Sequence, residues 1–386
     1  MKICVFTASI DKKGGGPSRS VPILVKGLSK VGVDVTLMTA ESDDMNIHSV
    51  EGQDVRVVTF RRDISEKDLE GLLLEGHFDL IHAQGIWVPL YHKMCKIARR
   101  HGIPYMMTPR GALEPWCYYD HTFFKRIKKQ IAMAVYQRND IQSADCVLAT
   151  AEMEANSLRD LSFTNPIAVI PNGIEIDEYP CRPVEAITKC KKQVLFLSRV
   201  VPKKGLDILI NAWPRVYRSF PEWKLLIVGN GEPDYINDLN SRIIKNGLSN
   251  IIKILPPAFG SNKYSLYVES SLFVLPTHSE NFGMVIAEAL ACGVPVITTK
   301  SAPWQLLEET HSGWWIDLSQ DNLEHSLLMA LSLPEQELFD MGQRGAEMVR
   351  REFYFVEVAN KILAVYQWIV NKTEKPPFVL AIDNDS

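Results

Sequence analysis

The stretch HSENFGMVIAEALACGVPVI, residues 278–297, decides the fold. It follows the apolar, strand-like run 271–275. From Gly283 onward its spacing is typical of a helix that stops at the breaker pair Gly293 and Pro295. A second strand-like run follows at 294–298. A strand, a helix and a strand in this order predict a parallel sheet that is buried on both faces.

The same alternation of short apolar runs and longer helical patterns continues through the chain. Strands are predicted at 3–8, 34–39, 55–60, 80–83, 105–108, 146–149 and 168–170, and in a second series at 194–198, 224–228, 251–255, 271–275 and 294–298. Helices are predicted at 20–30, 91–101, 125–140, 206–217, 236–246, 284–291 and 323–332. We therefore expect an α/β protein with two Rossmann-like domains, whose parallel sheets face a ligand-binding cleft.

A turn signal at Pro171-Asn172-Gly173 and a polar stretch at 175–192 separate the two series of strands. A chain of 386 residues is long enough for two hydrophobic cores. We expect an N-terminal domain over residues 1–175 and a C-terminal domain over 176–365. A tail over 366–386 is expected to pack back on the N-terminal domain and then to fray.

The composition is that of a globular protein, with 46% hydrophobic and 23% charged residues. A net charge of −4 gives no reason to expect a nucleic-acid partner. Seven scattered cysteines without a CxxC pair predict reduced thiols and a cytoplasmic protein. Because no apolar stretch reaches the length of a signal peptide or a membrane span, any membrane contact is expected to be peripheral, at the inner face of the cell membrane.

The loop before the helix at 284–291 carries the strongest chemical signal. Glu280 and Asn281 lie next to the helix N-terminus, where free backbone N–H groups and the helix dipole favour an anion. Glu288 lies about two turns into the helix. Two carboxylates so placed could bind hydroxyls at opposite ends of one ligand with a diphosphate between them. Singly, each glutamate is more simply a solvated or dipole-complementing residue, and only their joint spacing favours the ligand site.

Two further turns are suited to phosphate. Arg199 and Lys204 follow the first strand of the second series, and their cations suit a diphosphate, although a solvated basic turn would look the same. In the first half, Gly15 and Gly16 belong to a glycine run that follows the first strand and lets the backbone approach a ligand closely. The run lacks the GxGxxG spacing, which disfavours an NAD-dependent dehydrogenase.

These pieces, together with Gly229-Asn230-Gly231 and Pro171-Asn172-Gly173, resemble the retaining family 4 glycosyltransferases of the GT-B architecture. The resemblance covers nearly the whole chain and implies an acceptor-side first domain and a sugar-donor second domain. It implies catalytic roles for Glu280, Arg199 and Lys204, with Glu280 on the transferred sugar and the two cations on the diphosphate. It further implies donor binding through Gly15, Gly16, Arg110, Asn281, Phe282, Gly283, Met284, Val285 and Glu288, the last on the ribose.

Arg110 departs from the commonest pattern of the family. Many members carry a His-Gly pair where this chain has Arg110-Gly111, and the arginine resembles a branch of bacterial capsular and exopolysaccharide transferases. A histidine role at this position is therefore in doubt. His82 and Gln84, at the end of a predicted strand, are candidates for the pocket wall, although a histidine like His82 is more often a satisfied core-edge residue.

The resemblance implies a hexosyltransferase that retains the anomeric configuration and uses a nucleotide-sugar co-substrate without a further cofactor. UDP-glucose is the preferred donor and GDP-mannose its rival. The expected acceptor is a saccharide or a polyprenyl-linked saccharide of envelope-polysaccharide biosynthesis. No metal is expected, because the one DxD motif, Asp383-Asn384-Asp385, lies in the tail. The alternatives are a nucleotide-sugar epimerase or a phosphorylase on the same architecture, and a non-catalytic nucleotide-sugar-binding protein.

A basic, aromatic segment lies in the first half. Ten basic and two acidic residues fall between positions 93 and 138, with aromatic residues interleaved. This pattern suits an anionic membrane surface, and we expect peripheral membrane contact through residues 116–138. An ordinary solvated helix with its aromatic side chains in the core is the alternative.

Overall fold

A computed structural model describes residues 1–11, 15–46, 50, 54–119, 123–185 and 191–381. The chain divides into two compact units. The first unit consists of residues 1–174 and 355–386, and the second of residues 175–354. Each unit has its own sheet.

The first unit contains an eight-stranded sheet in the order β14-β7-β6-β5-β4-β1-β2-β3. The strands are β1 (Lys2–Thr7), β2 (Asp34–Ala40), β3 (Val55–Phe60), β4 (Leu80–Ala83), β5 (Tyr105–Met107), β6 (Cys146–Ala149), β7 (Ile167–Val169) and β14 (Val379–Leu380). Every pairing is parallel except that of β14 with β7. The carboxyl ends of the parallel strands therefore share one edge, where ligand-binding loops of such sheets are found.

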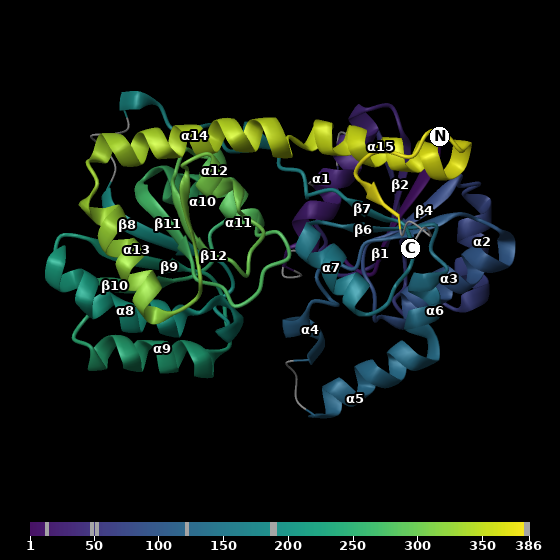
Figure 1. The fold of residues 1–386 in the computed structure, drawn as a ribbon. Helices are drawn as coiled ribbons and strands as arrows, with labels where there is room; N and C mark the ends of the chain where they lie inside the picture. Colours follow the sequence, from purple (N-terminus) through teal and green to yellow (C-terminus); the bar gives the residue numbers. More distant parts are fainter. Residues whose placement is uncertain (12–14, 47–49, 51–53, 120–122, 186–190, 382–386) are drawn as a thin grey trace, which may run out of the picture. The chain divides into compact units, whose positions relative to one another are not determined.

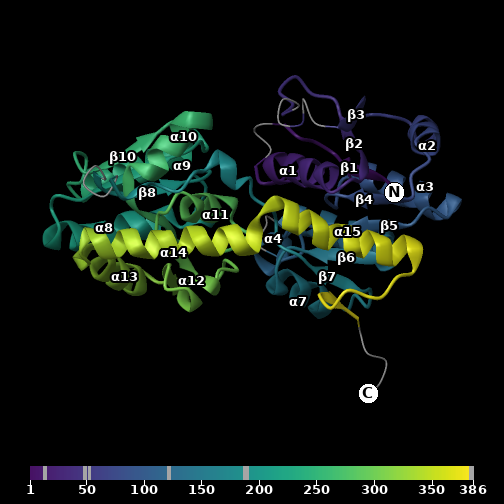
Figure 2. The ribbon, with the colours of Figure 1, turned by 90° about the horizontal axis from the view of Figure 1, so that it is seen from above.

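Helices cover both faces of this sheet. α1 (Pro17–Lys30) and α15 (Phe355–Asn371) pack together on one face, and Figures 1 and 2 show α15, in yellow, alongside α1, in purple. The other face carries α2 (Glu66–Glu75), α3 (Pro89–His101), α6 (Arg138–Gln142) and α7 (Glu152–Asp160). The remaining helical segments of this unit are α4 (Pro115–Tyr119), α5 (Phe123–Ala132) and the π-helical turn η2 (Met133–Gln137).

Strand β1 shows why the strands of this sheet are continuous apolar runs in the sequence. Cys4 and Phe6 belong to the core under α2 and α3, whereas Ile3 and Val5 belong to the core under α1 and α15. Alternate side chains thus enter two different cores, and both sets must be apolar.

The second boundary between the units was wrongly predicted. It lies between Tyr354 and Phe355 rather than after residue 365, because all of α15 belongs to the first unit. A single extended residue, Tyr354, separates α15 from the preceding helix. Gly27 of α1 lets α15 approach closely, since a Cβ there would lie 2.9 Å from the Phe355 carbonyl oxygen.

The second unit contains a six-stranded parallel sheet in the order β10-β9-β8-β11-β12-β13. Its strands are β8 (Lys191–Leu197), β9 (Lys224–Val228), β10 (Ile252–Leu255), β11 (Ser270–Leu275), β12 (Val296–Thr299) and β13 (Gly313–Ile316). α8 (Leu206–Ser219) and α9 (Pro233–Lys245) lie on one face of the sheet, and α10 (Gly260–Val268) and α11 (Met284–Ala291) on the other (Figure 1).

The remaining helical segments of the second unit are η3 (Ile176–Glu178), η5 (Pro202–Lys204), α12 (Leu306–Glu309), α13 (Gln320–Ser332) and α14 (Glu335–Phe353). The order β8-α8-β9 and β11-α11-β12 repeats the strand–helix–strand pattern in both directions from the centre of the sheet. The prediction of two α/β units with parallel sheets is thereby confirmed. The loops after β8 and β11, at the carboxyl edge of this sheet, carry the residues of greatest chemical interest.

Candidate functional site

The loop between β11 and α11 holds the N-terminus of the helix in a fixed conformation. Gly283, the residue that caps the helix, has a φ of +84°, in the left-handed region that favours glycine. A Cβ there would lie 2.9 Å from Cδ1 of Ile286 and 3.1 Å from Cγ of Glu280. Glycine is therefore required both by the backbone angle and by the close packing.

The N-terminus of α11 is suited to an anion. Within the part of the chain that the structure describes, no group accepts a hydrogen bond from the backbone N–H groups of Gly283, Met284 or Val285. The first N–H groups of a helix have no acceptor within the helix, and the positive end of the helix dipole lies at the same terminus. A phosphate oxygen could satisfy them at this position.

Two cations lie on neighbouring loops of the same unit. Lys204 ends η5 and is buried, and its Nζ forms an ion pair with the carboxylate of Glu280. Arg199 is exposed just after β8, and its guanidinium has no partner among the described residues. The structure therefore brings Lys204 and Glu280 together, and it places Arg199 at the same carboxyl edge of the sheet.

Backbone contacts fix the two loops to each other. The His278 N–H donates to the Lys203 carbonyl oxygen at 2.8 Å, and the Thr277 hydroxyl donates to the same oxygen at 3.2 Å. Gly205 has a φ of +66°, and a Cβ there would lie only 2.0 Å from the Pro276 carbonyl oxygen. The loop that carries Lys204 is thus held against the loop that carries Glu280.

The glycines after β9 have a conformational role. A Cβ at Gly229 would lie 1.8 Å from the Ser198 carbonyl oxygen, and one at Gly231 would lie 2.1 Å from that of Val200. An isolated parallel bridge joins Val200 to Gly231. Both glycines therefore allow the loop after β9 to lie directly on the loop that carries Arg199.

Glu288 is enclosed by side chains of its own unit. One carboxylate oxygen accepts a hydrogen bond from the Tyr267 hydroxyl at 2.8 Å and pairs with Lys263, and the other accepts from the Tyr179 hydroxyl at 3.3 Å. Glu288 and Lys263 are 1% and 5% exposed, and burial raises the pKa of Tyr267 well above its usual range. A carboxylate offers about four lone-pair sites, so at most one remains for a ligand hydroxyl.

Lys263, Tyr267 and Trp304 are residues that the sequence reasoning missed. Lys263 and Tyr267 lie on α10, one helical turn apart, and nothing in their local pattern indicates Glu288 as their partner. Trp304 lies in the loop after β12, beside the loop that carries Glu280, and its indole N–H donates to the Phe282 carbonyl oxygen at 2.5 Å. A large aromatic residue just past the carboxyl end of a parallel strand was the one available signal.

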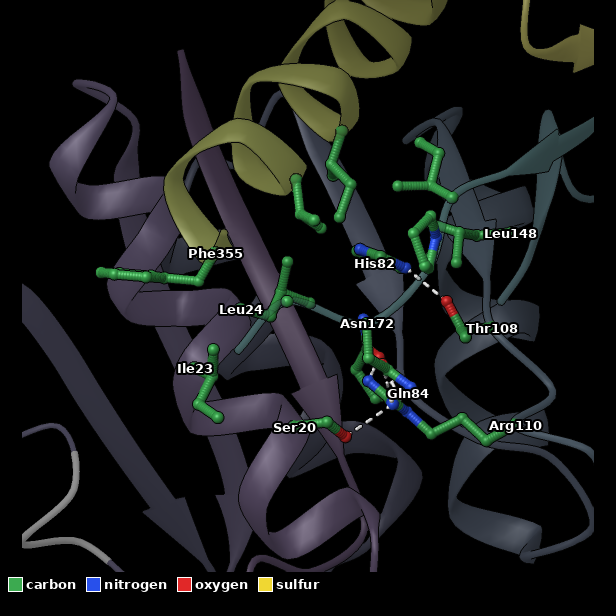
Figure 3. Close-up of a pocket in the computed structure, with 15 residues that line it drawn as sticks. Ser20, Ile23, Leu24, His82, Gln84, Thr108, Arg110, Leu148, Asn172 and Phe355 are labelled. Atoms are coloured by element: carbon green, nitrogen blue, oxygen red, sulfur yellow. Dashed lines mark hydrogen bonds between the residues drawn. The ribbon is translucent and has the colours of Figure 1, made fainter. Parts of the chain in front are cut away.

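In the first unit, Arg110 forms the centre of a polar cluster at the carboxyl ends of β4 and β5. Its guanidinium donates to Gln84 Oε1 from Nε at 3.1 Å, and Nη1 donates to the Ser20 hydroxyl at 2.7 Å and to Asn172 Oδ1 at 3.1 Å. Figure 3 shows these side chains converging at one end of a pocket, whose apolar side includes Ile23, Leu24, Leu148 and Phe355.

The backbone and the charge state of Arg110 are both unusual. Its φ of +58° is followed by +72° at Gly111, two successive residues in the left-handed region. Burial lowers the pKa of Arg110 to about 10, and the nearby Glu154 partly opposes this shift. Glu154 itself is buried and accepts hydrogen bonds from the Gly111 and Thr150 N–H groups. Arg110 therefore remains a cation at neutral pH, although its hydrogen-bond acceptors are uncharged.

His82 contacts protein groups through both ring nitrogens. Nδ1 lies 2.6 Å from the Tyr366 hydroxyl and Nε2 lies 2.7 Å from the Thr108 hydroxyl. Burial, together with the charge of Arg110, lowers the pKa of His82 well below 6.5. The imidazole is therefore neutral at pH 7 and links β4 and β5 to α15, which favours the core-edge interpretation.

Gly15 and Gly16 lie at the N-terminus of α1. Gly15 has a φ of +81°, and the Ser18 hydroxyl donates to its carbonyl oxygen at 2.6 Å. Gly16 immediately precedes the helix, and a Cβ there would meet no atom within 4 Å. The open space at Gly16 leaves the backbone accessible, whereas Gly14 lies outside the described residues.

No three His, Cys, Asp or Glu side chains of the described ranges lie close enough together to form a metal site. The motif Asp383-Asn384-Asp385 falls outside those ranges. None of the described helices combines the length and the apolar composition that a membrane crossing requires.

Known proteins resemble both units. The family profile described as Glycosyltransferase Family 4 matches residues 14–178, and the one described as Glycosyl transferases group 1 matches residues 181–348. A D-inositol 3-phosphate glycosyltransferase of Jonesia denitrificans is 23% identical over 95% of this chain and 95% of its own length. A phosphatidyl-myo-inositol mannosyltransferase of Mycobacterium leprae is 30% identical over 53% of this chain, and the chain spans 54% of that protein.

A solved structure agrees in fold. The structure of Anabaena Alr3699/HepE in complex with UDP and glucose has a TM-score of 0.74 to this chain at 19% identity, covering 95% of this chain and 99% of that one. The two family profiles together span both units, and the chain belongs to the family 4 glycosyltransferases of the GT-B fold.

Proposed function

We propose that the protein transfers a hexose from a nucleotide-diphosphate sugar to a saccharide acceptor, with retention of the anomeric configuration. The observation that carries this proposal is the α11 N-terminus, where three backbone N–H groups lack a partner among the described residues and lie beside Lys204 and Glu280. Diphosphate is the ligand whose charge and oxygen atoms match these donors.

Each candidate site residue of the second unit then has a distinct role. Lys204 and Arg199 bind the diphosphate, and the N–H groups of Gly283, Met284 and Val285 bind its oxygens. When Lys204 turns to phosphate, the carboxylate of Glu280 becomes available to the hydroxyls of the sugar. Asn281 and Phe282 form the remainder of this loop. Glu288 accepts one hydroxyl of the ribose while Lys263 and Tyr267 hold its carboxylate in place.

In the first unit, Arg110, Gly15 and Gly16 are proposed to act on the donor as well. Arg110 is a cation that donates its hydrogen bonds to uncharged acceptors, and an anionic ligand would add a charged acceptor to the nearby Glu154. Gly15 and Gly16 offer backbone at a helix N-terminus, which suits phosphate oxygens.

The proposed transfer needs no protein nucleophile. The acceptor hydroxyl attacks the anomeric carbon on the face from which the diphosphate departs. The bond from that carbon to the phosphate oxygen breaks, and the proton of the hydroxyl passes to an oxygen of the leaving diphosphate. The protein contributes orientation and stabilises the charge that develops on the diphosphate.

UDP-glucose is the proposed donor and GDP-mannose the alternative. The similar Anabaena structure contains UDP and glucose, whereas the Mycobacterium leprae relative is named a mannosyltransferase. The proposed acceptor is a saccharide or polyprenyl-linked saccharide of envelope polysaccharide in the cytoplasm. A nucleotide-sugar-binding protein without turnover is the second candidate.

A panel of UDP- and GDP-sugars in the presence of EDTA tests the donor and the absence of a metal requirement together. At a hundred-fold excess over its Kd the true donor should stabilise the folded chain by about 2.7 kcal/mol, because it binds only the folded state. We expect UDP-glucose to raise the unfolding temperature most. Slow hydrolysis of that donor, lost in Glu280→Ala, would identify an enzyme. Stabilisation that appears only after manganese is added would contradict the metal-free proposal.

We further propose that the segment 116–138 contacts an anionic membrane surface. Arg126 and Lys128 of α5 are exposed, and the apolar Ile131 and Val135 nearby are 57% and 73% exposed. Cations beside exposed apolar side chains are typical of helices that lie in a membrane interface. Residues 120–122 of this segment lie outside the described residues.

Vesicles that contain phosphatidylserine test this contact. Arg126→Gln with Lys128→Gln should weaken vesicle binding roughly thirty-fold, since each cation near an anionic surface contributes about 1 kcal/mol. Arg56→Gln with Lys67→Gln removes two exposed cations elsewhere in the same unit and should have little effect. Equal binding by both variants and the unaltered protein would indicate an ordinary solvated helix.

A further inference from the structure

Trp304 is fully buried in the second unit and contacts the loop that carries Glu280. Its ring packs against Phe282 and Phe353, with ring centroids 5.4 and 5.3 Å apart. In addition, its indole N–H donates to the Phe282 carbonyl oxygen at 2.5 Å. The indole therefore both supports the Phe282 ring and fixes the direction of one backbone carbonyl.

This hydrogen bond also determines where the Gly283 N–H points. The Phe282 carbonyl and the Gly283 N–H belong to one planar trans peptide group, in which the two bonds point in opposite directions. Because the carbonyl points to Trp304, the N–H points away from it, toward the side that has no protein acceptor among the described residues. The same N–H is the first of the three donors at the start of α11.

Without such a bond the peptide group could rotate. Glycine tolerates both signs of φ, so reversing the Phe282–Gly283 peptide group would meet little local resistance. The reversed group would present a carbonyl oxygen where the N–H now lies, and two negative oxygens would then face each other if a phosphate were bound. Trp304 removes this alternative, because rotation would break its hydrogen bond and leave a buried N–H unpaired.

The loop that carries Trp304 is itself braced. The indole N–H of Trp315 donates to the Ala302 carbonyl oxygen at 2.7 Å, and the Ser301 carbonyl accepts from the Glu280 N–H at 2.9 Å. The loop after β12 therefore contacts the Glu280 loop at two points, one at Glu280 and one at Phe282. Both contacts fix backbone groups rather than side chains alone.

We propose that Trp304 is a positioning residue of the sugar-donor site, which orients the Phe282–Gly283 peptide group so that its N–H meets a phosphate oxygen of the nucleotide-sugar. The inference rests on the proposed function of the second unit. It assigns to Trp304 an effect on nucleotide affinity that packing alone would not produce.

The second unit offers a matched control for removing one indole N–H. Trp213 of α8 is also fully buried, but its Nε1 has no hydrogen-bond partner within the described part of the chain. Trp304→Phe and Trp213→Phe therefore remove a comparable volume from the same unit, and only the first removes a hydrogen bond to the backbone.

We expect Trp304→Phe to raise the Kd for UDP and the KM for the donor about ten- to a hundred-fold, the effect of losing one aligned donor to a charged group. Trp213→Phe should lower the unfolding temperature but leave both constants unchanged. A merely structural role at Trp304 would reduce the active fraction, so that apparent kcat would fall while KM and Kd stayed constant. That pattern would overturn the proposal.

A second replacement separates the hydrogen bond from the ring. Incorporating 3-benzothienylalanine at position 304 keeps the shape of tryptophan but has no N–H, and it should reproduce the rise in Kd. A wild-type Kd with this replacement would overturn the inference. If the unaltered protein did not bind UDP, the proposed function itself would fail. If it bound UDP and all variants bound equally well, only the role of Trp304 would fail.

Discussion

Lys204→Met should lower kcat for sugar transfer about 10²- to 10³-fold, as expected when one preorganised electrostatic contact to a developing charge is lost. Lys204 is buried and pairs with Glu280, which lies three residues before Gly283, the N-cap of α11. The departing diphosphate gains negative charge as its bond to the sugar breaks. A cation at this position therefore stabilises the transition state more than the bound donor.

Lys203→Met is the matched control, because it removes the neighbouring lysine from the same short turn. It should leave kcat within a few-fold of the unaltered enzyme. The unfolding temperature of both variants should be measured, since Lys204→Met also leaves the Glu280 carboxylate without its cation. Near-normal turnover by Lys204→Met would place the diphosphate elsewhere. Equal losses in both variants would indicate a general effect of charge.

Glu288→Leu should raise the KM for the nucleotide-sugar about ten- to a hundred-fold with little change in kcat. The ribose is remote from the reacting bond, so its contacts contribute equally to the bound donor and the transition state. The loss of one charge-assisted hydrogen bond corresponds to about 1.5–3 kcal/mol. The same variant should be less stable by about 3–5 kcal/mol, because it removes the carboxylate that pairs with the buried cation of Lys263.

A double variant separates these two effects. Replacing the buried ion pair by apolar side chains, Lys263→Met with Glu288→Leu, should restore most of the stability, because neither partner is left charged in the core. The KM should remain high, because the acceptor for the ribose hydroxyl is still absent. A double variant with normal KM would mean that Glu288 serves only the packing of α10 against α11.

Local patterns in the sequence predicted much of the fold. The run 224–228 coincides with β9, and the run 194–198 covers the buried, apolar part of β8, because the buried residues of a parallel strand are apolar on both faces. The sequence also predicted the turn at Gly283 and the helix after it, since a glycine and a 3.6-residue hydrophobic period are local signals. Within the site, the structure joins Lys204 and Glu280 in an ion pair, and the catalytic roles that the resemblance implies for them stay predictions.

Contacts between distant residues were not predictable in this way. One partner of His82 is Tyr366, 284 residues later, and no local pattern links them. Lys263 looks like a surface lysine in the sequence but lies buried against Glu288. The predicted helix 125–140 is interrupted by the π-helical turn Met133–Gln137. The sequence pattern does not reveal this turn, because one inserted residue per turn hardly alters the hydrophobic period.

The domain boundary failed for a related reason. α14 and α15 are both amphipathic, and only the extended residue Tyr354 separates them, so the sequence reads almost as one long helix. The two helices nevertheless belong to different cores. Which core an amphipathic helix joins depends on the surface that it meets, and this information is not contained in its own residues.

The placement of α15 has a consequence for synthesis on the ribosome. Val21, Val25 and Leu28 of α1 share a core with Val358 and Ile362 of α15, yet the whole second unit is translated between the two helices. The second unit can therefore close its core first, while one side of the earlier-made sheet still exposes apolar surface. The first unit is therefore translated first, but its core is completed last.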